Sequence, residues 1–242
     1  PGAESGVQAG ESWFKGFPMP GARDPAVRFA IFAYPYDAPA GTPVHVKARD
    51  EAGNEVVAGF NLKVFPRQFR TRTLPIDDAF LGKVVPEILS HTPSLTDQGD
   101  LLKNYLAINR DLRAANNKAL AEMAARSQPR VLWRGPFRQL GNSQVEANFA
   151  DHPVYQYKGR EVDRQDHLGY DLATTAHAPV SASNEGVVLL ADYFGIYGNT
   201  IVIDHGYGLL TVYGHLASFA VKAGDSVKSG QVIAQSDSTG LA

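Results

Sequence analysis

The chain has 242 residues, enough for one large or two moderate domains. Its 23 basic and 25 acidic side chains give a net charge of −2, which excludes the basic surface of a typical nucleic-acid-binding protein. The absence of Cys excludes disulfides, thiolate metal ligands and a cysteine nucleophile. The sequence has no run of 18 apolar residues, so it predicts no membrane-spanning helix. The sequence starts at Pro1 with no signal-like segment, so we expect an internal fragment or a processed form.

The first 65 residues show a β pattern. Small residues, Gly and Pro predict an irregular lead over residues 1–25, and residues 50–55 predict a turn because Gly53 and Asn54 tolerate positive φ. Partial alternation of apolar side chains predicts three strands, at residues 27–34, 44–48 and 60–64. We therefore expect residues 1–65 to form an immunoglobulin-like β-sandwich module.

Residues 66–129 predict a Pro-marked connector that contains helix. Apolar residues recur at roughly helical spacing in its second half, with Ser94 and Thr96 as candidate caps. Two helices are predicted, near residues 77–89 and over residues 97–126. The longer one is interpreted as a packing helix between domains, because Asn116 and Asn117 interrupt the heptad that a coiled coil would need.

Residues 130–242 predict antiparallel β structure, with turns marked by glycine. The clearest short strands are at residues 186–191, 199–204, 209–213 and 231–235. The predicted fold class is therefore mainly β, with an N-terminal β module, a connecting helix and a C-terminal antiparallel β domain.

His167 and Asp171 are the first candidate site residues. Imidazole and carboxylate are ordinary Zn²⁺ ligands, and a separation of four places both side chains on one face of a strand or on one helical turn. A structural His and Asp at this spacing is the alternative.

His215 is the candidate catalytic residue. The strand before it alternates, so even separation places His215 on the face of Tyr213 and Thr211. If that face lines a cleft, the imidazole could orient a water or stabilise an oxyanion, and Tyr213 becomes a candidate substrate-binding residue. A surface histidine in a hairpin is the alternative. Other histidines are interpreted as structural (His205), in loops (His152, His177) or unrelated to the site (His45, His91).

An ordered series of motifs follows from residue 149 to residue 240. They are Phe149-Ala150-Asp151, Tyr155-Gln156-Tyr157-Lys158-Gly159, His167-Leu168-Gly169-Tyr170-Asp171, Pro179-Val180, Gly198-Asn199, Ile203-Asp204-His205-Gly206, Tyr213-Gly214-His215-Leu216, Gly224-Asp225, Gly230-Gln231 and Ser238-Thr239-Gly240. In this order, they resemble the catalytic domain of the lysostaphin-type (LytM-like) zinc metalloendopeptidases, which are peptidoglycan hydrolases.

The resemblance implies a function for each matched residue. His167 and Asp171 would bind Zn²⁺, and His215 would be catalytic. A His-x-His motif, expected a few residues after Gly240, would supply the third zinc ligand. The sequence ends at Ala242 before such a motif, so we expect the metallopeptidase domain of residues 130–242 to be incomplete and this chain to be inactive.

The same resemblance implies a substrate and a location. The substrate would be a peptide cross-link of bacterial peptidoglycan, cut in the cell envelope by a periplasmic or extracellular hydrolase. Accessory regions of the family position the protease or cover its cleft, and residues 1–129 would be such a region.

Two other functions stay open. A non-catalytic regulator of other cell-wall hydrolases would resemble this family but lack the metal ligands, and the presence of His167, Asp171 and His215 argues against it. A lipoyl- or biotinyl-type carrier shares the hairpin pattern of residues 221–233, but the chain shows no suitable Lys in a separate exposed hairpin turn.

Overall fold

A four-stranded antiparallel sheet forms the N-terminal part of the protein, in a computed structural model that describes residues 4–65 and 67–242. Its strand order is β2-β1-β5-β6. The strands are β1(Glu4–Ala9), β2(Ser12–Lys15), β5(Val44–Arg49) and β6(Glu55–Gly59), and a separate two-stranded ribbon joins β3(Phe17–Pro18) to β4(Arg28–Phe29). The β5–β6 turn was predicted: the Asp50 carboxylate accepts the Asn54 amide at 2.8 Å, and Gly53 has φ 88°.

Several expectations for this region are wrong. Residues 4–25 contain β1, β2 and β3 rather than an irregular lead, and residues 27–34 contribute only the short β4. Residues 60–64 alternate in sequence but form no strand, because a strand needs a hydrogen-bonding neighbour and β6 pairs only with β5. Within the described residues this gives one sheet and a ribbon, which does not confirm the immunoglobulin-like sandwich.

The connector takes part in a sheet with the C-terminal half. Strand β7(Thr71–Ile76) runs parallel to β9(His152–Tyr157), which pairs antiparallel with β10(Arg160–Arg164). Helix α1(Asp78–His91) follows at once, in agreement with the predicted helix. Its N-cap is Asp77, whose carboxylate accepts the Phe80 amide.

The longer predicted helix is continuous but irregular. It consists of α2(Leu101–Ala107), a π-helical turn over Ile108–Leu112, and α3(Arg113–Ala125). Its N-cap is Asp100 rather than Ser94 or Thr96, and the Asp100 carboxylate accepts the Lys103 amide at 2.8 Å. No helix in the described part of the chain is both long and apolar enough to cross a membrane.

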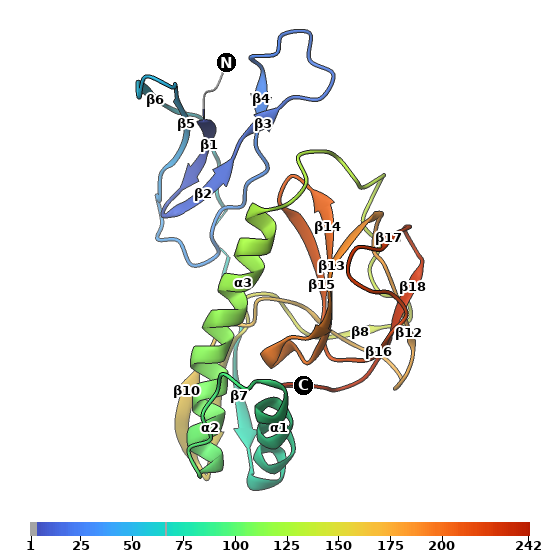
Figure 1. Cartoon of the computed structure of the whole chain (residues 1–242). Coiled ribbons are helices and arrows are strands. Elements are labelled where there is room, and N and C mark those ends of the chain that lie inside the picture. The colour runs from blue at the N-terminus through green and yellow to red at the C-terminus, as the bar shows by residue number, and fades with distance from the viewer. Residues whose placement is uncertain (1–3, 66) are drawn as a thin grey trace.

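Antiparallel strands fill the C-terminal half, so the protein is mainly β (Figure 1). The sheets are β15-β14-β13-β17, β12-β18-β16 and β11-β8. Their strands are β8(Gln144–Ala147), β11(Asp171–Ala173), β12(Pro179–Ser181), β13(Gly186–Tyr193), β14(Asn199–Gly206), β15(Leu209–Tyr213), β16(Leu216–Phe219), β17(Ser226–Val227) and β18(Val232–Ser236). The four strands predicted here correspond to β13, β14, β15 and β18. Val188, Ile201, Ile203 and Ile233 form the centre of their core.

The helix packs against the C-terminal half through two side-chain amides, of which that of Asn116 is buried (Figure 1). Asn116 accepts the backbone N–H of Ile196 at 3.0 Å, and Asn117 accepts the Tyr197 hydroxyl at 3.0 Å. Both partners lie in the 3₁₀ turn Gly195–Tyr197. The segment therefore packs against the C-terminal half, while its place between two domains stays a prediction, and two residues of the turn that it contacts line the cavity of the candidate site.

Candidate metal and catalytic site

A cavity of about 510 Å³ brings together the three residues singled out by the motifs. His167, Asp171 and His215 all line it. Most of the remaining lining comes from β7, helices α1 to α3 with the π turn, β8, β9, the 3₁₀ turn Gly195–Tyr197 and the last two residues, Leu241 and Ala242. The cavity is therefore built by the C-terminal strands and by the connector together.

His167 and Asp171 face each other directly. His167 lies in the loop before β11, Asp171 begins β11, and the Nε2 to Oδ1 distance is 3.1 Å. Two donors bonded at about 2.0–2.1 Å to one tetrahedral zinc lie roughly 3.3 Å apart. The observed separation therefore fits a pair of ligands that share one ion.

A backbone carbonyl sets the orientation of the His167 ring. Its Nδ1 lies 3.0 Å from the carbonyl oxygen of Asn148, which favours the tautomer with the proton on Nδ1. Nε2 is then the nitrogen that faces Asp171 and could bind a metal after losing its proton, as in histidines that bind metal while the other nitrogen donates a hydrogen bond.

The loop that carries this carbonyl is itself fixed. The amide of Ala150 donates to the carbonyl of His167 at 2.7 Å, and the amide of His167 donates to the carbonyl of Asp151 at 2.9 Å. The buried Asp151 carboxylate accepts the Arg70 guanidinium at 2.5 Å. The Phe149-Ala150-Asp151 motif thus positions the candidate ligand His167.

The pair has complementary electrostatics. The hydrogen bond with Asp171 raises the pKa of His167, while burial opposes that rise. Burial acts to raise the pKa of Asp171, but the hydrogen bond and charge of His167, with the charges of His215 and Arg72, hold that pKa below its ordinary value. The carboxylate is therefore anionic at neutral pH, the form that binds a cation.

His215 has the geometry of a neutral base. Its Nδ1 lies 2.6 Å from the carbonyl oxygen of Thr239, which leaves Nε2 without a proton. Burial lowers its pKa below the ordinary value, although the Thr239 carbonyl and Asp171 act in the opposite direction. An uncharged imidazole with a free Nε2 can accept a proton at neutral pH.

Tyr213 does not lie in the cavity beside His215. Strand β15 ends at Tyr213, and His215 has φ 56°, so strand alternation does not extend to it. The Tyr213 hydroxyl accepts the Ser183 amide at 2.7 Å and donates to the Ser183 hydroxyl at 2.9 Å. Tyr213 is absent from the cavity lining, so the expectation that it faces the cleft beside His215 is corrected.

The other histidines are placed elsewhere. His205 is fully buried and contacts the Glu185 carbonyl and the Thr211 hydroxyl, at 2.6 and 2.8 Å. His152 pairs with Asp166 at 2.6 Å, and Asp166 also accepts the Tyr36 hydroxyl at 2.6 Å. Within residues 4–65 and 67–242, no group of three His, Cys, Asp or Glu residues is arranged to hold a metal.

Sequence reasoning missed the helical wall of the cavity. Tyr105, Asn109 and Arg113 line it from α2, the π turn and the start of α3. The available signal was the polar residues Asn109 and Asn116 within an otherwise apolar helical pattern, since a buried amide must find partners.

Comparison with known proteins matches the C-terminal part of the chain. Residues 165–242 match the model of peptidase family M23. The DD-carboxypeptidase/endopeptidase Mpg of Neisseria meningitidis is 40% identical over 74 residues, which are 31% of this chain and 17% of that protein. The peptidoglycan DD-endopeptidase ShyB of Vibrio cholerae is 36% identical over 97 residues, 40% of this chain and 22% of that protein.

A third relative is named as a regulator. The murein hydrolase activator EnvC of Escherichia coli is 36% identical over 72 residues, 30% of this chain and 17% of that protein. The matched segments thus span 17% to 22% of the lengths of these three relatives.

One solved structure resembles nearly the whole chain. It comes from Pseudomonas aeruginosa and is provisionally described as a peptidase M23. The TM-score is 0.58 at 18% sequence identity, over 99% of this chain and 78% of that one. The arrangement of N-terminal strands, helices and C-terminal strands is therefore a shared fold.

Proposed function

We propose that this protein is a zinc-dependent endopeptidase that cuts peptide cross-links of bacterial peptidoglycan, because residues 165–242 match the model of peptidase family M23. The observation that carries the proposal is the convergence of His167, Asp171 and His215 on one cavity. Relatives named as peptidoglycan DD-endopeptidases support the substrate, and a wall substrate favours the cell envelope as the location.

The proposed chemistry divides between the candidate zinc ligands, His167 and Asp171, and the candidate base, His215. His167 Nε2 and Asp171 Oδ1 would hold Zn²⁺, which when bound polarises a peptide carbonyl and lowers the pKa of a water. His215 Nε2 accepts a proton from the attacking water and returns it to the leaving amine. The carbonyls of Asn148 and Thr239 keep both rings in the tautomers that these functions need.

A third protein ligand is part of the proposal. The resemblance implies a His-x-His motif after Gly240, and the 242 residues contain no His-x-His. Two protein ligands bind Zn²⁺ more weakly than the three of a catalytic site. We therefore expect the 242-residue chain to bind Zn²⁺ weakly and to leave peptidoglycan intact, and a form extended past Ala242 to hydrolyse it. Equal turnover by the two forms would contradict the ligand set.

Variants of the extended form test the assignments. Asp171→Ala should lose most bound zinc by elemental analysis, because one ligand is removed. His215→Ala should retain zinc but lose about 10²- to 10⁴-fold of its hydrolysis, the usual contribution of a general base. His177→Asn is the matched control, since His177 is exposed, lies outside the cavity and has φ 58°, which Asn tolerates. Loss of zinc in His215→Ala would make His215 a ligand instead.

A regulatory function is the second candidate, because one relative is named as an activator. An activator would stimulate a separate hydrolase without cutting peptidoglycan itself. Hydrolysis of purified peptidoglycan by the extended form alone separates the two functions, and the arrangement of His167, Asp171 and His215 favours the enzyme.

A further inference from the structure

Arg113 occupies an unusual place in the cavity wall. It begins α3 directly after the π-helical turn, and it lines the same cavity as His167, Asp171 and His215. Single π-helical turns within longer helices are rare and frequently occur at functional sites. The guanidinium therefore lies near the proposed chemistry but comes from outside the matched family segment.

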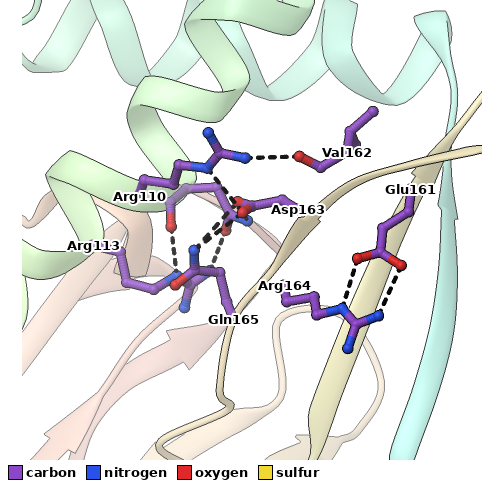
Figure 2. Close-up of polar contacts among 8 residues, drawn as sticks. Arg110, Arg113, Glu161, Val162, Asp163, Arg164 and Gln165 are labelled. Atoms are coloured by element: carbon purple, nitrogen blue, oxygen red, sulfur yellow. Dashed lines mark hydrogen bonds and ion pairs between the residues drawn. The ribbon is translucent and has the colours of Figure 1, made fainter.

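A buried polar chain holds this side chain in place (Figure 2). Arg113 donates from Nη2 to the Asn109 Oδ1 at 2.6 Å and from Nε to the Asn109 carbonyl at 3.1 Å. Asn109 is fully buried and donates from Nδ2 to Asp163 at 2.9 Å. The buried Asp163 also accepts Arg110 at 2.9 Å, so the chain ends on a neutralised carboxylate.

Arg113 itself lacks such a counter-charge. In the described part of the chain, no carboxylate oxygen lies within 4.0 Å of its guanidinium nitrogens. Its recorded bonds use two of the five N–H donors, which leaves three. Three of the five acids that line the cavity have cationic partners of their own: Asp151 has Arg70, Asp166 has His152, and Asp171 has His167.

The charge of Arg113 reaches across the cavity. Burial raises the pKa values of Tyr155 and Tyr197, and the positive charge of Arg113 opposes both rises. These two tyrosines belong to β9 and to the 3₁₀ turn, on separate walls. A fixed cation with free donors and aromatic neighbours is suited to bind a carboxylate, because a guanidinium offers two parallel N–H bonds to it.

We propose that Arg113 recognises a carboxylate of the peptide substrate and thereby selects peptides that carry one near the bond to be cut. The inference rests on the proposed function, since it names a feature of the substrate at that site. Asn109 and Asp163 are positioning residues, because they act only through Arg113.

A pair of peptides tests the proposal. A peptidoglycan-derived peptide with a free C-terminal carboxylate is compared with the same peptide as its C-terminal amide, using the form extended past Ala242. Arg113→Gln should raise KM for the free acid about tenfold to a hundredfold, the range of a charge-assisted hydrogen bond, and leave KM for the amide unchanged. Arg113→Lys should recover part of the preference for the free acid, because it restores the positive charge but not the pair of parallel N–H donors of a guanidinium. Lys118→Gln, on the exposed face of the same helix, is the matched control for loss of charge.

Binding without hydrolysis separates the two proposals. Both peptides are titrated calorimetrically into the EDTA-treated protein, where the wild type should prefer the free acid and Arg113→Gln should not. If the wild type hydrolyses nothing but shows this preference, the proposed function fails and the carboxylate site stands. If Arg113→Gln keeps the wild-type preference in binding and in KM, or if the wild type has none, the carboxylate site is overturned.

Discussion

Replacing Asn116 by Ala removes the buried contact through which α3 fixes the 3₁₀ turn Gly195–Tyr197. The Asn116 side chain is 7% exposed and accepts the N–H of Ile196, which is 3% exposed, at 3.0 Å. A buried N–H left without a partner costs about 1–3 kcal/mol. Ala gains roughly 0.6 kcal/mol over Asn in helix propensity. The net loss is therefore about 0.5–2.5 kcal/mol, or roughly 1–10 °C in Tm for a protein of this size.

Two variants on the same helix make this measurement decisive. Asn117→Ala has the same propensity gain but loses a part-buried bond to the Tyr197 hydroxyl, so its loss should be smaller. Lys118→Ala removes an 80% exposed side chain and should change stability by less than about 0.5 kcal/mol. Stability is followed by thermal and urea unfolding. If Asn116→Ala has the same Tm and urea midpoint as Lys118→Ala, the buried amide does not stabilise the turn and the reasoning fails.

Three further changes follow from single contacts. Arg70→Met should raise the pH midpoint of acid unfolding, followed by circular dichroism. The Arg70 hydrogen bond holds the pKa of Asp151 below its unfolded value of about 3.9. The stabilisation from this bond is therefore full above about pH 3.9 and is lost as the pH falls through the folded pKa. An unchanged midpoint would show that the Arg70–Asp151 contact does not contribute to stability. Gly198→Ala should lower the free energy of unfolding by about 1–3 kcal/mol, since Gly198 has φ 61° and ψ −146° and an added Cβ would meet Thr239. Gly59→Ala is the control, because a Cβ at Gly59 meets nothing within 4 Å. Tyr213→Phe should lower Tm, because the Ser183 amide loses its acceptor, while peptidoglycan hydrolysis by the extended form stays the same; a tenfold loss of hydrolysis at unchanged Tm would return Tyr213 to the substrate site.

Local patterns predicted the C-terminal strands well and the N-terminal ones poorly. In β13 and β14 the apolar residues Val188, Ile201 and Ile203 lie in one core, so the apolar sequence pattern marks the side chains that are buried. In the N-terminal part the core is small, and exposed apolar residues such as Leu62 and Val64 give a strand-like pattern without burial. Strand β1 was missed because its small and polar residues show little alternation, and its neighbours β2 and β5 make it a strand.

The candidate site divides in a similar way. The positions of His167, Asp171 and His215 could be expected from motifs, because each lies beside a short strand whose pattern is local. The carbonyls of Asn148 and Thr239 that orient the rings could not, because any residue supplies a carbonyl. Tyr213 was misplaced because strand alternation was continued through Gly214 to a residue with positive φ.

The lining of the cavity indicates which part of the chain would contact the proposed peptide substrate. Fourteen of the 22 residues that line it precede residue 165, where the match to the family begins. The matched segment contributes the proposed ligands and base, whereas β7, the helical region, β8 and β9 contribute much of the remaining lining. Differences in the bond that is cut can therefore arise from the wall that carries Arg113 while the proposed zinc chemistry stays the same. For this reason the specificity of the protein is best tested at Arg113 and its support Asn109, and its chemistry at His167, Asp171 and His215.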